Sequence, residues 1–203
     1  MSQLILIRHG QSEWNAENRF TGWVDSPLSD KGRDEAKRAG DRLAGEGVRV
    51  DVAFTSTLRR AIDTGRIVLD SLGQDDLEQV QAWELNERFY GALTGRNKAQ
   101  TAGEFGEEQV RVWRRSYDVP PPGGESLKDT ANRTLPYFER VVVPKTAEVA
   151  AVLISAHGNS LRAIVKELDG LSDDAVTRLE IATGVPIVYE MTGGGPVGKR
   201  ILE

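Results

Sequence analysis

The sequence predicts an α/β protein in which a mostly parallel central sheet is flanked by helices. Short apolar runs recur along the chain, and the stronger ones are each followed by a stretch in which apolar residues recur at helical spacing. Strands that alternate with helices in this way form parallel sheets covered by helices. Because 203 residues can bury a substantial core, we expect residues 1–203 to form a single domain.

Apolar runs define the expected strands. Parallel strands are expected at residues 4–7, 50–54, 80–83 and 149–154. A terminal hairpin is expected from the two runs at residues 186–191 and 199–202, which are separated by three consecutive glycines.

Helical periodicity and capping residues define the expected helices, which are at residues 28–43, 58–69, 107–117, 126–142 and 160–168. Ser29 is the expected N-cap of the first of these helices. Ser126 and Asp129 have the spacing of a capping box, with the aspartate in place of the usual Glu or Gln. Residues 84–106 are polar, contain several glycines and lack a core pattern, and a segment of this length and kind is usually functional.

Charge and composition exclude several classes of protein. The formal net charge of −5 argues against a general nucleic-acid or anionic-membrane binder, since either needs an extended basic face. The chain has no cysteine, so disulfides, thiolate metal sites and cysteine nucleophiles are excluded. The N-terminal segment lacks a basic region and a long apolar run, which indicates a cytoplasmic protein with no membrane partner.

The only two histidines follow two of the expected strands and begin the same pattern. Residues 9–12 and 157–160 both read His-Gly-x-Ser. Because parallel strands end at the same edge of a sheet, where ligands bind in α/β proteins, His9 and His157 are expected to face one ligand. A lone histidine is more often inert than catalytic, but this repeated placement favours function. A metal site is the rival interpretation, but no third ligand stands at a recognisable spacing, so we expect no metal.

Arginine and lysine side chains accompany these strand ends. Arg8 adjoins His9, and Arg59 follows the second strand. Guanidinium groups match phosphate oxygens, so several of them converging on one pocket of an acidic protein would select a small, highly charged anion. The pattern therefore predicts phosphoryl transfer with His9 as the nucleophile. Glu87 is a candidate general acid or base in a polar loop, although from the pattern alone Glu84 and Glu13 are comparable candidates.

Several longer segments together resemble one family, the cofactor-dependent phosphoglycerate mutases of the histidine phosphatase superfamily. The matching segments are residues 6–15, 20–23, 55–61, 85–95, 97–99, 113–118, 124–127 and 156–162. Arg-His-Gly at residues 8–10 marks only the superfamily. Glu-Arg-x-Tyr-Gly at residues 87–91 and Trp-Arg-Arg-Ser-Tyr at residues 113–117 are similar to the mutases specifically.

The resemblance implies a three-layer sandwich fold, with residues 84–125 capping the substrate. It also implies that His9 becomes phosphorylated, that His157 hydrogen-bonds the phosphoryl group and that Glu87 shuttles the substrate hydroxyl proton. The residues implied to hold the transferring phosphate are Arg8, Asn15, Arg59, Gly158 and Asn159, and Ser12 is implied to bind substrate as well. Those implied to bind the rest of the substrate are Thr21, Gly22, Arg88, Tyr90, Lys98, Arg114 and Arg115.

The activity that the resemblance implies is an isomerase of glycolysis and gluconeogenesis. It would interconvert 3-phosphoglycerate and 2-phosphoglycerate, with 2,3-bisphosphoglycerate as the phosphoryl primer and no metal. The residues themselves leave two alternatives. A histidine phosphatase with broad specificity would use the same histidines but would not require Arg88, Lys98, Arg114 and Arg115. A phosphate-binding module without catalysis would be expected to lack His9, His157 or Glu87.

The chain departs from longer members of this family in two places. Pro122 leads through Gly123 directly into Gly124, where longer members carry an insertion, and the chain ends soon after Leu202. Both regions bear on lid closure and subunit contacts. A homo-oligomer is therefore an open expectation that the resemblance alone does not decide.

Overall fold

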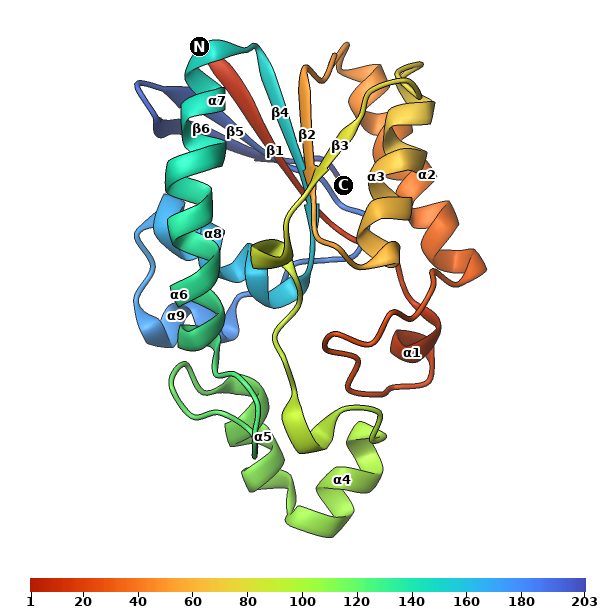
Figure 1. The fold of residues 1–203 in the computed structure, drawn as a ribbon, viewed down its shortest axis with the longest axis vertical. Coiled ribbons are helices and arrows are strands. Elements are labelled where there is room, and N and C mark those ends of the chain that lie inside the picture. The colour runs from red at the N-terminus through yellow and green to blue at the C-terminus, as the bar shows by residue number, and fades with distance from the viewer.

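A six-stranded sheet with the order β3-β2-β4-β1-β5-β6 forms the middle layer of the computed structural model, which describes residues 1–203 (Figure 1). The strands are β1 (Ser2–Arg8), β2 (Val52–Thr55), β3 (Gln79–Gln81), β4 (Ala151–Ala156), β5 (Ile187–Thr192) and β6 (Gly195–Ile201). Strands β1 to β4 pair in parallel, whereas the hairpin β5–β6 adds to β1 in antiparallel orientation. The predicted α/β class, the mostly parallel sheet and the terminal hairpin are confirmed.

The two central strands set the position of the histidines. Strands β1 and β4 pair directly, and the last matched pair in their register is Arg8 with Ala156. His9 and His157 are the next residues on each strand, so the backbone alone brings them to the same point at the edge of the sheet. This is the carboxyl edge, at which α/β proteins bind ligands.

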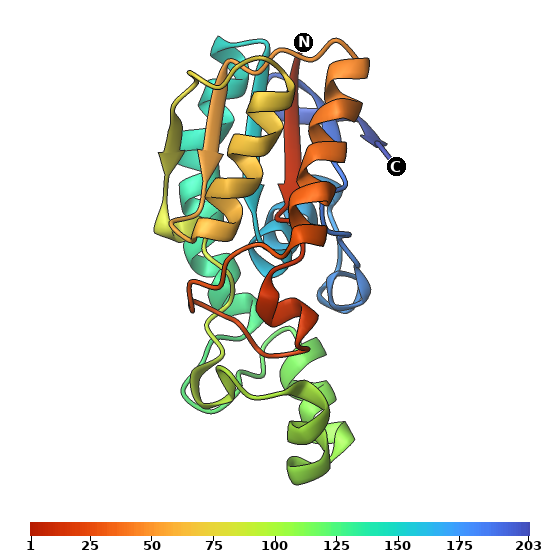
Figure 2. The ribbon, with the colours of Figure 1, turned by 90° about the vertical axis from the view of Figure 1, so that its right-hand side faces the viewer.

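Helices lie on both faces of the sheet and beyond its carboxyl edge (Figure 2). Their bounds are α1 (Glu13–Ala16), α2 (Asp30–Gly45), α3 (Arg59–Ser71), α4 (Lys98–Phe105), α5 (Glu107–Arg115), α6 (Leu127–Tyr137), α7 (Val143–Glu148), α8 (Gly158–Asp169) and α9 (Asp173–Arg178). Short 3₁₀ turns occupy Trp83–Leu85 and Gly91–Leu93, and a π-helical turn occupies Phe138–Val142. No helix is long and apolar enough to cross a membrane.

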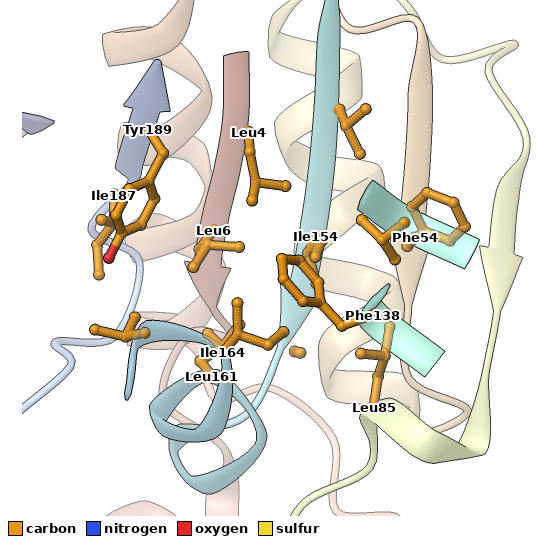
Figure 3. Packing of buried hydrophobic residues seen from close by; sticks show 14 of the residues in the cluster. Leu4, Leu6, Phe54, Leu85, Phe138, Ile154, Leu161, Ile164, Ile187 and Tyr189 are labelled. Carbon is orange, nitrogen blue, oxygen red and sulfur yellow. The ribbon is translucent and has the colours of Figure 1, made fainter. Parts of the chain in front are cut away.

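Alternate residues of β1 belong to two separate cores. Leu4 and Leu6 pack with Phe138 and with α8, in the cluster drawn in Figure 3. Ile5 and Ile7 point to the opposite face of the sheet and pack against α2 and α3. Successive side chains of a strand point to opposite faces, so a continuous apolar run of this kind requires burial on both faces. The predicted three-layer sandwich is confirmed.

Residues 84–125 lie largely beyond the carboxyl edge of the sheet, where α4 and α5 are farthest from the strands (Figures 1 and 2). A small core of Phe20, Leu93 and Val110 holds this part of the chain together. The short helical pieces predicted within residues 84–106 are confirmed, and this segment lies beyond the strand ends.

The structure differs from the sequence prediction in a few elements. Helices α1, α7 and α9 were not expected, because each is too short to show a helical period. The helix expected over residues 126–142 begins at the predicted capping box but changes to a π-helical turn after Tyr137. Pro136 has no N–H for the helical ladder, and proline is a usual origin of such an irregularity.

A close approach between two backbones fixes the loop that carries His9. A side chain built on Gly32, in the first turn of α2, would overlap the Gln11 carbonyl, and one built on Gly10 would overlap the Gly32 carbonyl. The carboxylate of Glu35 also accepts a hydrogen bond from the Gln11 N–H at 2.8 Å. The N-terminal part of α2 therefore supports the loop directly after His9.

We expect Gly32→Ala to destabilise the protein by about 1–3 kcal/mol, the usual cost of overpacking a tight contact. Urea unfolding would measure the change. Gly45→Ala is the matched control, because Gly45 ends the same helix and an added Cβ meets no atom within 4 Å. We expect that control to be neutral or to stabilise by up to about 1 kcal/mol. Equal destabilisation by both variants would contradict the role of the close approach.

Candidate active site

The two histidines meet at the carboxyl edge of β1 and β4. Both are buried, and their ring centroids lie 4.9 Å apart with the planes inclined at 62°. His9 follows β1 directly, and His157 is the N-cap residue of α8. The predicted meeting of the two imidazoles is thus found in the structure.

Hydrogen bonds define which nitrogen of His9 is reactive. Its Nδ1 lies 2.7 Å from the Gly10 carbonyl oxygen, which can only accept, so Nδ1 carries the proton. The lone pair of a neutral imidazole is then on Nε2, and this is the atom that faces the neighbouring guanidinium. An imidazole in this tautomer can attack an electrophile such as phosphorus through Nε2.

Burial keeps both imidazoles neutral. It lowers the pKa of His9 well below its ordinary value, and the positive charges of Arg60 and Arg8 lower it further. The pKa of His157 is also lowered well below its ordinary value, first by burial and then by Arg60 and His9. Both rings are therefore neutral near neutral pH, and a neutral imidazole has a lone pair free on one ring nitrogen.

Arg60, and not the predicted Arg59, is the guanidinium at His9. The side chain of Arg60 is buried, and its Nε donates to His9 Nε2 at 3.2 Å. Its Nη1 and Nη2 donate to the carbonyls of Val24 and Gly22, both at 2.8 Å. Burial lowers the pKa of Arg60 to about 10, so the group stays charged at neutral pH.

The prediction of Arg59 as a phosphate ligand was wrong by one position. Arg59 is the first residue of α3 and is exposed, and its backbone N–H donates to Asp25. The buried stripe of α3 runs through Arg60, Thr64 and Val68 at intervals of four residues. This period was readable in the sequence and places Arg60 on the inner face of the helix, one helical step of about 100° from Arg59.

A serine that the sequence prediction did not single out holds His157. The Nε2 of His157 lies 2.7 Å from Ser56 Oγ, which also accepts the Leu58 N–H at 3.1 Å. The Nδ1 of His157 is buried and has no protein partner. Ser56 follows β2, the strand next to β4, so topology brings it to the same edge.

Glu87 is anchored at the site by one of its carboxylate oxygens. Its Oε1 accepts the N–H of Arg88 at 2.7 Å, and the backbone and side-chain nitrogens of Asn159 at 3.2 and 2.8 Å. Burial raises the pKa of Glu87, but these hydrogen bonds and the charges of Arg8 and Arg60 outweigh burial and lower it overall. Glu87 is therefore ionised, with Oε2 left to take a proton.

A cavity of about 60 Å³ joins these groups. Its lining residues are Arg8, His9, Asn15, Arg19, Phe20, Thr21, Gly22, Arg60, Glu87, Tyr90 and Lys98. All of these except Arg19, Phe20 and Arg60 were predicted, and they make up half of the predicted site residues. Gly158 lies beside Arg8 and Glu87, and a Cβ on it would stand 3.5 Å from the Arg8 guanidinium. The sequence prediction did not include Arg19 or Phe20 as site residues, although it did include Thr21 and Gly22, which follow them.

Buried donors without protein partners surround this cavity. They include Arg8 Nε, Thr21 Oγ1 and two nitrogens of Arg88, Nε and Nη1. Unpaired buried polar groups are costly, so donors that converge in this way indicate an anionic ligand with several oxygen atoms. A phosphate ester fits such a donor set.

Seven predicted ligands do not line the cavity: Arg59, Gly158 and Asn159, described above, and Ser12, Arg88, Arg114 and Arg115. Ser12 is fully buried and caps α1, where its Oγ accepts the N–H of Asn15, so it acts on the position of Asn15. Arg88 is buried 4.9 Å from the ring centroid of Tyr90. Arg114 lines a second hollow of about 380 Å³, and Lys98 lines both this hollow and the first cavity. Arg115 lines the second hollow too and is ion-paired with Glu180 at 2.5 Å.

The family follows from the match of the whole chain. The family model of the histidine phosphatase superfamily (branch 1) matches residues 4–202. The chain belongs to this superfamily.

Proteins that match this chain over nearly their full length are named phosphoglycerate mutases. A 2,3-bisphosphoglycerate-dependent phosphoglycerate mutase of Parvibaculum lavamentivorans is 56% identical over 98% of this chain and 95% of its own length. A phosphoglycerate mutase of Schizosaccharomyces pombe is 51% identical with the same coverage.

Solved structures of the superfamily have the same fold. YhfR of Bacillus stearothermophilus matches with a TM-score of 0.84 at 29% identity, over 97% of this chain and 94% of that one. A mycobacterial glucosyl-3-phosphoglycerate phosphatase in complex with VO3 matches with a TM-score of 0.82 at 27% identity, over 94% and 93% of the two chains.

We expect Arg60→Gln to weaken the binding of inorganic phosphate by roughly ten- to a hundredfold, since hydrogen bonds to charged groups contribute about 1.5–3 kcal/mol. Isothermal titration calorimetry would measure the dissociation constant. Arg59→Gln is the matched control and should bind phosphate as the wild type does. A larger loss in Arg59→Gln than in Arg60→Gln would contradict the assignment.

The buried neutral histidines should make the protein less stable in acid. Below a pH of about 6.5 the unfolded chain binds protons at His9 and His157 that the folded protein excludes, so stability falls as the pH decreases. Between pH 7.5 and 5.5 we expect a loss of up to about 1.4 kcal/mol for each histidine. Urea unfolding at the two pH values would measure it, and a loss in His9→Gln or His157→Gln as large as in the wild type would contradict the prediction.

Proposed function

We propose that this protein is a 2,3-bisphosphoglycerate-dependent phosphoglycerate mutase that interconverts 3-phosphoglycerate and 2-phosphoglycerate. The observation that carries the proposal is the ionised carboxylate of Glu87, which lines the same cavity as His9. A nucleophile that stores a phosphoryl group and a base that accepts a hydroxyl proton together allow transfer to an alcohol. The names of relatives that are more than half identical support this activity.

The central step moves a phosphoryl group between His9 and a substrate hydroxyl. When phospho-His9 reacts, the bond from Nε2 to phosphorus breaks and its electron pair returns to Nε2. A bond from phosphorus to the hydroxyl oxygen forms, and the hydroxyl proton passes to Glu87 Oε2. Arg8 and Arg60 stabilise the charge on the phosphoryl oxygens during transfer, and His157 donates from an imidazole nitrogen.

The donor set of the cavity also fits the primer. Free 2,3-bisphosphoglycerate supplies the first phosphoryl group when it is bound. Arg8, Arg60 and Asn15 would hold its transferring phosphate near His9, because all three line the cavity. The unpartnered donors of Thr21 and Arg88 match further anionic oxygens of the same ligand.

Lys98 and the cations of α5 provide a site for a second anionic group of the substrate. Lys98 lines both the cavity at His9 and the hollow that contains Arg114 and Arg115. We infer that residues 84–125 cap the substrate and that these cations bind its second charged group. Arg115 would exchange Glu180 for this group on binding, because a half-exposed ion pair of this kind is weak.

A phosphatase is the second candidate function. The solved structure with VO3 that resembles this chain is a phosphatase, and it has the same fold. Hydrolysis would follow if water reached phospho-His9 in place of the glycerate hydroxyl. The cations that extend from Lys98 to Arg114 favour the mutase, because a phosphatase for small monoesters does not require a second anion site.

A coupled assay tests the proposed function directly. We expect purified protein to convert 3-phosphoglycerate into 2-phosphoglycerate, with a rate that rises when catalytic amounts of 2,3-bisphosphoglycerate are added. His9→Ala should lose at least a thousandfold in kcat, the order of loss seen when a nucleophile is removed. Release of inorganic phosphate without 2-phosphoglycerate would establish the phosphatase instead. Full activity in His9→Ala would exclude the phosphohistidine mechanism.

A further inference from the structure

Arg133 lies on α6, outside the cavity, and forms several hydrogen bonds with the loop that carries Glu87. Its Nη1 donates to the Glu84 carbonyl at 2.8 Å, and its Nη2 donates to the carbonyls of Asn86 and Glu87 at 3.1 and 2.9 Å. One planar guanidinium therefore binds three carbonyls within four consecutive residues. No lysine could reproduce this arrangement, because an ammonium lacks the rigid fork.

Glu125 binds both Arg133 and the same loop. Its Oε1 accepts from Nε of Arg133 and its Oε2 from Nη2, both at 2.9 Å, so the two hydrogens of Nη2 are shared among three acceptors. The side chain of Arg133 is only 9% exposed. The Oε2 of Glu125 also accepts the Phe89 N–H at 3.0 Å, while its own N–H donates to the Phe89 carbonyl at 2.7 Å. Arg133 and Glu125, which we call the clasp, thus bind the loop on both sides of Glu87.

Glu87 is held from its backbone as well as from its carboxylate. Its carbonyl accepts from Arg133 and also from the indole nitrogen of Trp23 at 2.5 Å. The Trp23 ring lies 5.6 Å below the Arg133 guanidinium. Because the carboxylate Oε1 is fixed by Asn159 and the Arg88 N–H, the direction of the free Oε2 depends on where this backbone stands.

We propose that the clasp of Arg133 and Glu125 positions Glu87 for proton transfer, so that Arg133 is a positioning residue of the reaction. The inference rests on the proposed function, in which Glu87 takes the hydroxyl proton of the phosphoryl acceptor. A small displacement of a catalytic group can cost about a hundredfold in rate. Loss of the clasp should therefore slow transfers that need Glu87 and spare those that do not.

The main test is a double-mutant cycle on mutase activity. We expect Arg133→Lys to lower kcat by about ten- to a hundredfold with little change in KM. In a Glu87→Gln background the same substitution should have almost no further effect, because the group that it positions has already lost its function. Arg140→Lys is the matched control, since Arg140 is exposed and lies on the following π-helical turn.

A second measurement separates positioning from general damage. Acetyl phosphate transfers its phosphoryl group to His9 Nε2 and releases acetate, which leaves as a stable anion and needs no proton. We expect Arg133→Lys to form phospho-His9 from acetyl phosphate at the wild-type rate, but to discharge it slowly to 3-phosphoglycerate. Glu125→Gln should show the same pattern and replaces Arg133→Lys if that variant does not fold.

The outcomes are distinct. Equal slowing of charging and discharge, or a full additional loss of activity in the Glu87→Gln background, would make the clasp merely structural and overturn the inference. Unchanged kcat in both clasp variants would overturn it too. If Glu87→Gln itself retained full mutase activity, the proposed proton transfer would fail, and the inference would fail with it for that separate reason.

Discussion

Buried positive charge at the carboxyl edge of the sheet governs the chemistry of this protein. Arg8 and Arg60 line the cavity there together with Glu87, its one carboxylate, and the buried Arg88 lies beside the lining residue Tyr90. Burial lowers the pKa values of both histidines, and the charges of Arg60 and Arg8 lower them further. Hydrogen bonds and the same two charges outweigh the effect of burial on the pKa of Glu87. A neutral imidazole and an ionised carboxylate therefore coexist in one small cavity at the same pH.

Regular secondary structure holds most of the residues that surround the cavity. The histidines follow directly on paired strands, Arg60 lies in the first turn of a helix, and Asn159 in the first turn of another. Glu87 is the exception, because it lies on an irregular segment between two 3₁₀ turns. The dense hydrogen bonding around residues 84–89 replaces the regular structure that holds the other residues of the site.

Sequence reasoning predicted the parts of the fold that depend on local periodicity. The parallel strands, the longer helices and the terminal hairpin all carry such a signal, whereas α1, α7 and α9 are too short for one. The pairing of His9 with His157 was predictable because topology alone brings strand ends together. Arg60 was missed although the helical period contained its position. Ser56 and Arg133 could not be found in this way, because their roles depend on contacts across 101 residues and across 46 to 49 residues.

The unpartnered donors of Arg8 and Arg88 have a consequence for the life of the protein in a cell. Any ligand that binds the folded state alone shifts the folding equilibrium toward that state, by an amount that grows with ligand concentration relative to its dissociation constant. Phosphorylated metabolites that bind this pocket would thus act as folding stabilisers. The lifetime of the enzyme against heat and proteolysis would rise and fall with the pool of phosphorylated metabolites that it binds.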